Sequence, residues 1–185
     1  MDVLNIGIIG TGRISDLHTI EYLQNPKTRI TAVADIELEL AKMRGAKWGV
    51  AADHIFQDYR DLLALKDVDL VEILLPHHLH RQATLDAAAA GKHISLQKPM
   101  ALSIAQADEM IAAAEKAGVF FKVFENFIFY PPVLKAKELI VNGEIGDPLT
   151  IRIKSNAGVS PTMWDVPRAA QVWRFDPDTC GGGPL

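Results

Sequence analysis

Lys98 is the residue of this chain whose type and position best suit the movement of a proton. It stands in Gln97-Lys98-Pro99, directly after residues 93–96, a largely apolar segment that indicates a strand. Lysine changes its charge readily on burial or beside another cation, and a neutral amine can take a proton from a substrate hydroxyl. The alternative is a solvated lysine at a strand end. The Lys98–Pro99 bond is also a candidate cis peptide, since a sharp exit there would aim the side chain.

A second chemical signal is Gly10-x-Gly12, which follows the apolar run 3–9 and precedes a helix-like segment. The run is β-branched and too short for a helix, so it indicates a buried parallel strand. The glycines allow a tight turn and a close backbone approach to a pyrophosphate at a helix N-terminus. Ser15 takes the third position of the G-x-G-x-x-G pattern, where a small side chain suffices for packing. The alternative is a Gly-rich turn without a ligand.

Asp35 ends the next predicted strand, near the spacing of ~20 residues expected for the acid that binds an adenosine ribose. Its carboxylate can accept hydrogen bonds from both ribose hydroxyls and would repel a 2′-phosphate, and Ile36-Glu37 offers no arginine. The sequence therefore predicts NAD rather than NADP, and a lower Kd for NADP in calorimetry would contradict this. Asp35 can also cap the helix that starts near Glu37, and the two roles can coexist.

His77, His78 and His80 raise the question of a metal site. Adjacent histidines point apart, and no Cys or carboxylate cluster completes a ligand set, so we expect no metal here. A loop and helix N-cap role is the simpler interpretation of His80.

Two tryptophans near the end of the chain, Trp164 and Trp173, stand close to Arg168 and Arg174. They suit either a lid that contacts substrate or apolar packing beneath surface arginines. The sequence does not decide between these two interpretations.

The elements that must position these residues alternate between strands and helices. Strands are predicted at 3–9, 29–34, 54–56, 70–75, 93–96 and 119–124, and helices at 14–23, 37–48, 59–65, 80–90 and 103–117. Short connections between such elements predict a doubly wound parallel sheet, the Rossmann type of α/β fold, with helices on both faces. The predicted core-facing stripes of two of the helices are Ile14, Leu17, Ile20 and Leu23, and Ile104, Ala107, Ile111 and Ala114.

Ligands of a doubly wound sheet bind outside the carboxyl ends of the strands. Unusual residues recur at these ends, so one crevice is a better explanation than several unrelated motifs. The predicted cofactor-binding residues are Gly10, Gly12, Arg13, Ile14, Asp35, Leu75, Pro76, His77, His80, Gln97, Lys98 and Asn126.

The regular alternation of strand and helix patterns ends near residue 125, which predicts a boundary between two domains. Residues 1–125 form the nucleotide-binding domain, and residues 126–185 are expected to begin a second, open-sheet α/β domain that is incomplete. A helix is predicted from Pro131 to Asn142, and the alternation over 148–154 predicts a strand with one wet face. Residues 156–185 show no convincing element, which suggests a functional loop or a missing continuation.

Bulk composition excludes several classes of partner. The net charge is −4 at pH 7 without a Lys/Arg block, so neither nucleic acid nor an anionic membrane is expected as a main partner. A single cysteine, Cys180, rules out an internal disulfide. Neither a signal peptide nor a long apolar run is evident, and the expected location is the cytoplasm.

These residues resemble the glucose–fructose oxidoreductase / inositol dehydrogenase (Gfo/Idh/MocA) family along nearly the whole chain. The resemblance rests on Gly7-Ile-Ile-Gly10-Thr-Gly12, Asp35, Leu75-Pro76-His77-His78-Leu79-His80, Ala90-Gly91-Lys92-His93, Gln97-Lys98-Pro99, Glu125-Asn126, and Trp173-Arg174 followed by Gly181-Gly182-Gly183. It implies an NAD-dependent enzyme that oxidises or reduces a secondary alcohol of a sugar, cyclitol or related polyol. It also implies that Lys98 is the catalytic lysine, that His80 is the loop histidine, and that Trp173 and Arg174 join Lys98 in the substrate region.

Three features depart from the family pattern. Gln97 replaces the usual glutamate, which removes the charge that would hold Lys98 protonated. His77 replaces the usual asparagine. The sequence stops at Leu185, before the Asp and His that complete the family's proton relay, so we expect a truncated member.

Three functions remain open on the sequence alone. The first is the dehydrogenase, expected to be a homo-oligomer in its full-length form. The second is a dinucleotide-binding fragment or sensor without turnover. The third, also raised by the family, is NAD-assisted cleavage of a glycosidic bond. The substrate and the direction of the reaction are left open.

Overall fold

The structure is a computed structural model that describes residues 3–152 and 176–180. By their internal contacts these residues divide into two units. The first unit holds residues 3–124 together with 176–180, and the second holds residues 125–152.

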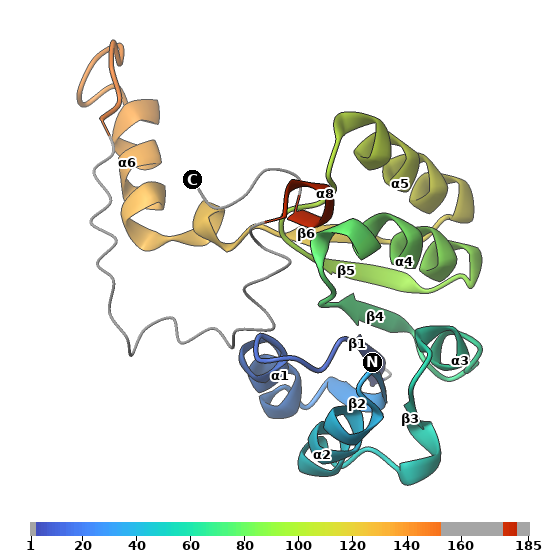
Figure 1. The fold of residues 1–185 in the computed structure, drawn as a ribbon. Helices are drawn as coiled ribbons and strands as arrows, with labels where there is room; N and C mark the ends of the chain where they lie inside the picture. Colours follow the sequence, from blue (N-terminus) through green and yellow to red (C-terminus); the bar gives the residue numbers. More distant parts are fainter. Residues whose placement is uncertain (1–2, 153–175, 181–185) are drawn as a thin grey trace. The chain divides into compact units, whose positions relative to one another are not determined.

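The first unit is built on a sheet of six parallel strands in the order β3-β2-β1-β4-β5-β6. The strands are β1 (Leu4–Ile9), β2 (Thr28–Ala34), β3 (Ile55–Phe56), β4 (Leu70–Ile73), β5 (His93–Gln97) and β6 (Phe121–Phe124). The chain runs outward from β1 to β3, returns to the centre at β4, and runs outward again to β6 (Figure 1). This order confirms the predicted doubly wound sheet, whose direction reverses between β1 and β4.

Helices cover both faces of the sheet. Helices α1 (Ser15–Gln24) and α2 (Leu38–Trp48) pack on one face, and α3 (Tyr59–Leu63), α4 (His77–Ala89) and α5 (Ile104–Ala117) pack on the other. A short 3-10 turn, η1 (Ala52–His54), leads into β3, and the single helical turn α8 (Pro177–Cys180) lies against α4. The prediction of no element after residue 156 is therefore wrong at α8.

Side-chain alternation along the strands supplies a separate core on each face. Val71 and Ile73 of β4 point to the side of α4 and α5, where Met110 is also fully buried. Ile6 and Ile8 of β1 point to the side of α1 and α2. Each such side chain contributes about 1.5–3 kcal/mol relative to exposure, so both layers of helices are held to the sheet by apolar burial.

Local sequence signals set most helix ends. Gly49 and Gly118 follow α2 and α5 with φ of 76° and 66°, as expected of glycines that end helices. The Ser103 hydroxyl accepts the Gln106 N–H at 3.3 Å. In return, the Gln106 side chain accepts the N–H of Leu102 and not that of Ser103, as it would in a capping box.

Helix α4 begins at His77, three residues before the predicted start at His80. Pro76, with φ of −57°, precedes its first residue, and a proline is pre-organised for a helix start because its φ is fixed. His80 therefore lies one turn inside the helix and is not its N-cap.

The predicted apolar stripe along α1 is right at Ile14, which packs against the core, and wrong at its other three positions. Leu17, Ile20 and Leu23 are 65%, 44% and 51% exposed, whereas Ser15 and Thr19 are buried. The strand beneath α1 is β4, which carries the buried carboxyl group of Glu72. His18 and Tyr22 of α1 hydrogen-bond to this group, so the polar side of the helix faces the sheet.

The predicted stripe of α5 is only partly right. Ala114 is buried, but Ile104 and Ile111 are 82% and 42% exposed. Met110 takes the place of Ile111 in the core.

The second unit contains η2 (Asn126–Phe129) and α6 (Pro131–Val141), which confirms the helix predicted from Pro131. The strand predicted over 148–154 is wrong for its described part, since 148–152 form no regular structure. Leu149 and Ile151 are 95% and 76% exposed. A strand needs a partner for its backbone N–H and C=O groups, and no strand is found among residues 125–152.

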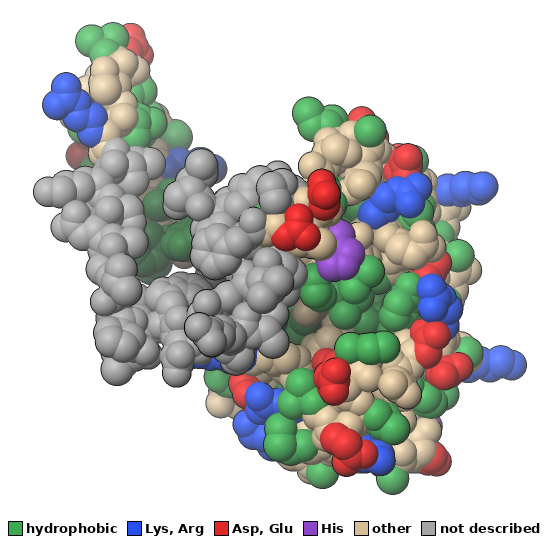
Figure 2. Space-filling view, in the orientation of Figure 1, with side chains coloured by type: hydrophobic (Ala, Val, Ile, Leu, Met, Phe, Trp, Pro, Cys, Tyr) green, Lys and Arg blue, Asp and Glu red, His purple; other side chains and the backbone are tan. Residues whose placement is uncertain are grey.

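One face of the molecule, drawn in Figure 2, carries both signs of charge. On the face shown in Figure 2, Lys and Arg side chains lie among Asp and Glu side chains without a patch of one sign. None of the helices within 3–152 and 176–180 has the length and apolar content needed to cross a membrane.

Candidate functional site

The carboxyl ends of four neighbouring strands bring the predicted site residues of the first unit to one edge of the sheet. Gly10 follows β1, Asp35 follows β2, Pro76 follows β4 and Lys98 follows β5. Since all these strands are parallel, their carboxyl ends lie at the same edge. The strand order reverses direction between β1 and β4. In doubly wound sheets, ligands usually bind at the carboxyl ends of the strands beside such a reversal.

Gly10 is the residue that brings the turn after β1 against β4. Its φ is +93°, and a Cβ there would lie 2.7 Å from the carbonyl oxygen of Leu74. Its N–H donates to the Ala34 carbonyl at 2.8 Å. No other residue meets both demands, because a side chain would be strained by the φ and would also clash with the backbone.

Gly12 differs from Gly10 in its surroundings, because a Cβ at Gly12 would meet no atom within 4 Å. The space beside its backbone is therefore open, at the residue that leads into α1. Ser15 is fully buried and its hydroxyl donates to the Gly12 carbonyl at 2.6 Å, so the small third residue of the motif packs as the pattern requires. An open backbone at a helix N-terminus fits a pyrophosphate.

The Asp35 carboxylate ties the glycine turn to the start of α2. Its Oδ2 accepts from the N–H and the hydroxyl of Thr11 at 2.6 and 3.0 Å, and its Oδ1 accepts from the Glu37 N–H at 3.0 Å. A carboxylate offers about four lone-pair positions, so three are in use and one on Oδ1 remains for a ligand hydroxyl. Asp35 is not the N-cap of α2, because that position belongs to Glu37, whose side chain makes no cap hydrogen bond; Asp35 instead binds the N–H of this N-cap residue.

His80 connects the ends of β4 and β5 from inside α4. The side chain is fully buried, with Nε2 at 2.8 Å from the Leu75 carbonyl oxygen and Nδ1 at 2.9 Å from that of Pro99. Burial lowers the pKa of His80 despite these two carbonyl acceptors, and nearby His77 acts in the same direction as burial. The ring thus lies between the two loops of the edge, and in its neutral form it donates to one of the two carbonyl oxygens.

Lys98 itself is exposed at the end of β5, and the bond that follows it, Lys98–Pro99, is cis. Its backbone N–H donates to Gln97 Oε1 at 2.7 Å. The neighbouring glutamine is therefore coupled directly to the backbone that carries the lysine.

Sequence reasoning missed a buried polar group beneath this edge. Gln97 Nε2 lies 2.8 Å from His18 Nε2, His18 Nδ1 lies 2.8 Å from Glu72 Oε1, and the Tyr22 hydroxyl donates to Glu72 Oε2 at 2.8 Å. Glu72 is fully buried, and burial together with its negative charge raises the pKa of Tyr22. One signal was available, since Glu72 interrupts an otherwise apolar strand and His18 and Tyr22 are one helical turn apart.

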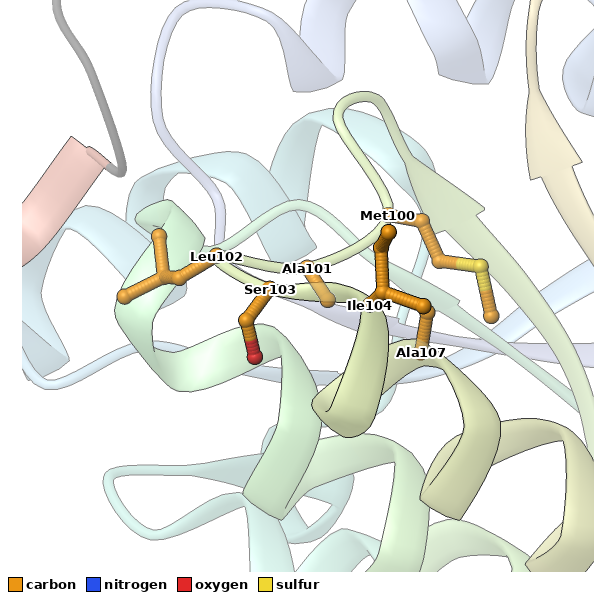
Figure 3. Close-up of a pocket in the computed structure, with 6 residues that line it drawn as sticks. All are labelled: Met100, Ala101, Leu102, Ser103, Ile104 and Ala107. Atoms are coloured by element: carbon orange, nitrogen blue, oxygen red, sulfur yellow. The ribbon is translucent and has the colours of Figure 1, made fainter.

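An apolar hollow of about 320 Å³ lies next to the lysine loop (Figure 3). Its lining residues come from the segment between β5 and α5 and from the first turn of α5: Met100, Ala101, Leu102, Ser103, Ile104 and Ala107. The only polar side chain among them, Ser103, caps α5. None of the predicted cofactor-binding residues lines it, so it is not the predicted crevice.

The remaining predicted residues lie in the turn before α1, in the second unit or outside the described residues. The backbone of Asn126 lies in η2 of the second unit, and Trp164, Arg168, Trp173 and Arg174 fall outside the described residues. Arg13 is exposed, and Ile14 takes the N-cap position of α1.

The neighbours of His80 show no sign of a metal site. His77 Nδ1 lies 3.1 Å from the Cys180 carbonyl oxygen, and His78 is exposed. Within the described ranges, no three His, Cys, Asp or Glu side chains gather as metal ligands would.

Comparison with known proteins gives one family. A model of the Gfo/Idh/MocA family, described as an oxidoreductase family with an NAD-binding Rossmann fold, matches residues 4–125. The oxidoreductase YrbE of Bacillus subtilis is 37% identical over 157 residues, which cover 85% of this chain and 46% of that protein. Levoglucosan dehydrogenase of Pseudarthrobacter phenanthrenivorans is 30% identical over all of this chain and 48% of its own length.

The fold has a solved counterpart. The crystal structure of an NAD-binding oxidoreductase from Klebsiella pneumoniae superimposes with a TM-score of 0.77 at 34% identity, and the match covers 98% of this chain and 48% of that one. The chain thus spans about half the length of the relatives it matches.

Proposed function

The chain belongs to the Gfo/Idh/MocA family of NAD-binding oxidoreductases, and from this premise we propose the reaction of the whole protein. It transfers a hydride between a nicotinamide nucleotide and a secondary alcohol of a sugar, cyclitol or related polyol. The observation that carries the proposal is the meeting of the glycine turn, Asp35 and Lys98 at one edge of the sheet.

The residues of the first unit hold the nucleotide in this proposal. Gly12 leaves its backbone open to the pyrophosphate, and Asp35 keeps one acceptor for a hydroxyl of the adenosine ribose. A 2′-phosphate at the same place would bring a second negative charge against that carboxylate. NAD is therefore the proposed cofactor in preference to NADP.

Lys98 moves the proton in this proposal. The hydride chemistry is supplied by the bound nicotinamide nucleotide, and oxidation of an alcohol also releases the hydroxyl proton. The support is the position of Lys98 at the carboxyl end of β5, at the same edge as the glycine turn: its neutral amine would take that proton, and its ammonium would return it in the reverse direction.

A carbohydrate-like substrate is supported by the similarity to a levoglucosan dehydrogenase along the whole of this chain. The residues proposed from the sequence to contact substrate are Lys98, Trp173 and Arg174. The screen described next identifies which polyol the protein oxidises.

The test is a screen of the full-length native protein against sugars and cyclitols, with NAD and NADP followed by absorbance. We expect nucleotide reduction with at least one polyol, and a lower KM for NAD than for NADP. Binding of NAD without turnover of any compound would favour the alternative of a binding module. Release of a free sugar without net NADH formation would favour glycosidic cleavage.

A further inference from the structure

One hydrogen-bonded group lies beneath Lys98, in which Glu72 is fully buried and Gln97, His18 and Tyr22 are partly buried. The backbone N–H of Lys98 can only donate, so the Gln97 atom that faces it at 2.7 Å is the oxygen. The other end of the amide, Nε2, must then donate to His18 Nε2 at 2.8 Å. A histidine nitrogen that accepts carries no proton, so the single proton of a neutral His18 lies on Nδ1.

The same reasoning continues to the far end of the group. His18 Nδ1 donates to Glu72 Oε1 at 2.8 Å, and the Tyr22 hydroxyl donates to Glu72 Oε2 at 2.8 Å. Each carboxyl oxygen of Glu72 therefore faces a hydrogen-bond donor, as a carboxylate at this position requires. This matters because the carboxyl group is fully buried, where a charge without hydrogen-bonding partners would be costly.

The surrounding elements hold each member of the group in place. Glu72 points to the α1 side of the sheet, since its neighbours Val71 and Ile73 point to the other core. The ring of Phe124 packs against the His18 ring at 4.8 Å between centroids. The group thus joins α1, β4 and β5 directly under the strand end that carries the lysine.

We propose that Tyr22, Glu72 and His18 are positioning residues that fix the Gln97 amide in one orientation and thereby fix the backbone of Lys98. The proposal rests on the proposed function for the role of Lys98, but the proton pattern stands without it. The proposal also explains why a glutamine suits position 97, since its amide can both accept from Lys98 and donate to His18. A glutamate there has no N–H for His18 Nε2, so His18 would have to carry a proton on that nitrogen.

The proton pattern is tested by the ring ¹⁵N shifts of histidine in the ¹⁵N-histidine-labelled protein, with His18 assigned from a His18→Gln variant. We expect the His18 ring to carry a proton on Nδ1 and none on Nε2. In Gln97→Glu we expect a proton on Nε2. A proton on Nε2 in the unmodified protein would overturn the proposal, as would an unchanged Nδ1–H tautomer in Gln97→Glu.

The positioning role is tested by kinetics of the full-length protein. Tyr22→Phe removes one hydrogen bond to Glu72 and Glu72→Gln removes the carboxylate itself, and each is expected to lower kcat about tenfold with the Kd for NAD unchanged. Tyr59→Phe is the matched control, since the Tyr59 hydroxyl donates to Asp86 at 2.6 Å outside the group. Equal kcat values for Tyr22→Phe and Tyr59→Phe would overturn the positioning role.

The design separates this proposal from the proposed function. If the full-length protein turns over no polyol, the ¹⁵N shifts still decide whether the proton pattern is right. If Glu72→Gln fails to fold, Tyr22→Phe carries the kinetic comparison, because it removes a single hydroxyl and keeps the ring.

Discussion

The two ends of β5 each carry a lysine in a recognisable motif, and the two lysines have opposite surroundings. Lys92, just before the strand, is 7% exposed, and its ammonium donates to the carbonyl oxygens of Leu65 and Val68 at 2.5 and 2.8 Å. Lys98, just after the strand, is exposed. The ammonium of the first lysine is bound within the fold, whereas the second lysine is exposed.

The same contrast extends along both edges of the sheet. At the amino edge, the Asn5 side chain donates to the Asp67 carbonyl and the Asp69 carboxylate accepts from the Asn5 N–H, each at 2.8 Å. At the carboxyl edge, Gly12 faces open space and Asp35 keeps an unused acceptor position. Residue type alone does not separate polar groups whose hydrogen bonds are all made within the fold from those that keep an unused position. Their hydrogen-bond partners make that distinction.

The largest expected effect comes from replacing each lysine by methionine. Lys98→Met should lower kcat by about 10²–10⁴-fold, the usual contribution of a proton-transfer group, with little change in NAD binding or in Tm. Lys92→Met should instead lower the free energy of unfolding by about 1–3 kcal/mol, because two buried carbonyls lose their donor. Both variants are measured by turnover and urea unfolding, and wild-type turnover in Lys98→Met would remove that lysine from the mechanism.

The second comparison sets the two glycines of the turn against each other. Gly10→Ala combines a strained φ with a clash against the Leu74 carbonyl oxygen, so we expect a loss of about 1–3 kcal/mol of stability. Gly12→Ala should fold normally and weaken NAD binding, because its methyl group fills the open space. Urea unfolding and calorimetry separate the two outcomes, and equal stability losses would contradict the assigned roles.

The third comparison concerns Asp35 and the choice of nucleotide. The unmodified protein should bind NAD more tightly than NADP, and Asp35→Asn should reduce that preference about tenfold, since a repulsion of about 1.4 kcal/mol is removed. Calorimetry with both nucleotides gives the ratio. The preference for NAD would have another source if the ratio stayed constant in this variant.

The smallest expected effect is a pH dependence of stability from His80. Burial lowers the pKa of this histidine below the ordinary value of 6.5, so the unfolded chain binds the proton first as the pH falls. Stability should therefore decrease below about pH 6.5, by at most about 1.4 kcal/mol per pH unit for one group. The exposed His78 provides a control, and a slope that survives in His80→Gln but disappears in His78→Gln would contradict the assignment.

The sequence predicted the sheet well because the strand signals are local. Short β-branched runs, Gly49 and Gly118 after helices, and Pro76 after β4 all act within a few residues. The buried group around Glu72 was not predicted, because its partners lie 54 and 50 residues away along the chain.

The predicted packing face of α1 failed for a related physical reason. The pattern of Leu17, Ile20 and Leu23 indicates a buried apolar stripe, yet the sheet beneath offers a carboxylate. The face that packs is therefore the one with Ser15, Thr19 and the half-buried His18. An apolar stripe shows only that a helix is amphipathic, whereas the strand beneath it decides which face is buried.

The most direct test of the central claim is a titration of the ¹⁵N-labelled protein with NAD, followed through its backbone amide resonances. The account predicts shifts at the carboxyl edge, at Gly10, Gly12 and Lys98, with Asn5 and Lys92 at the opposite edge unchanged. Shifts confined to the amino edge, or no shifts at saturating NAD, would contradict it.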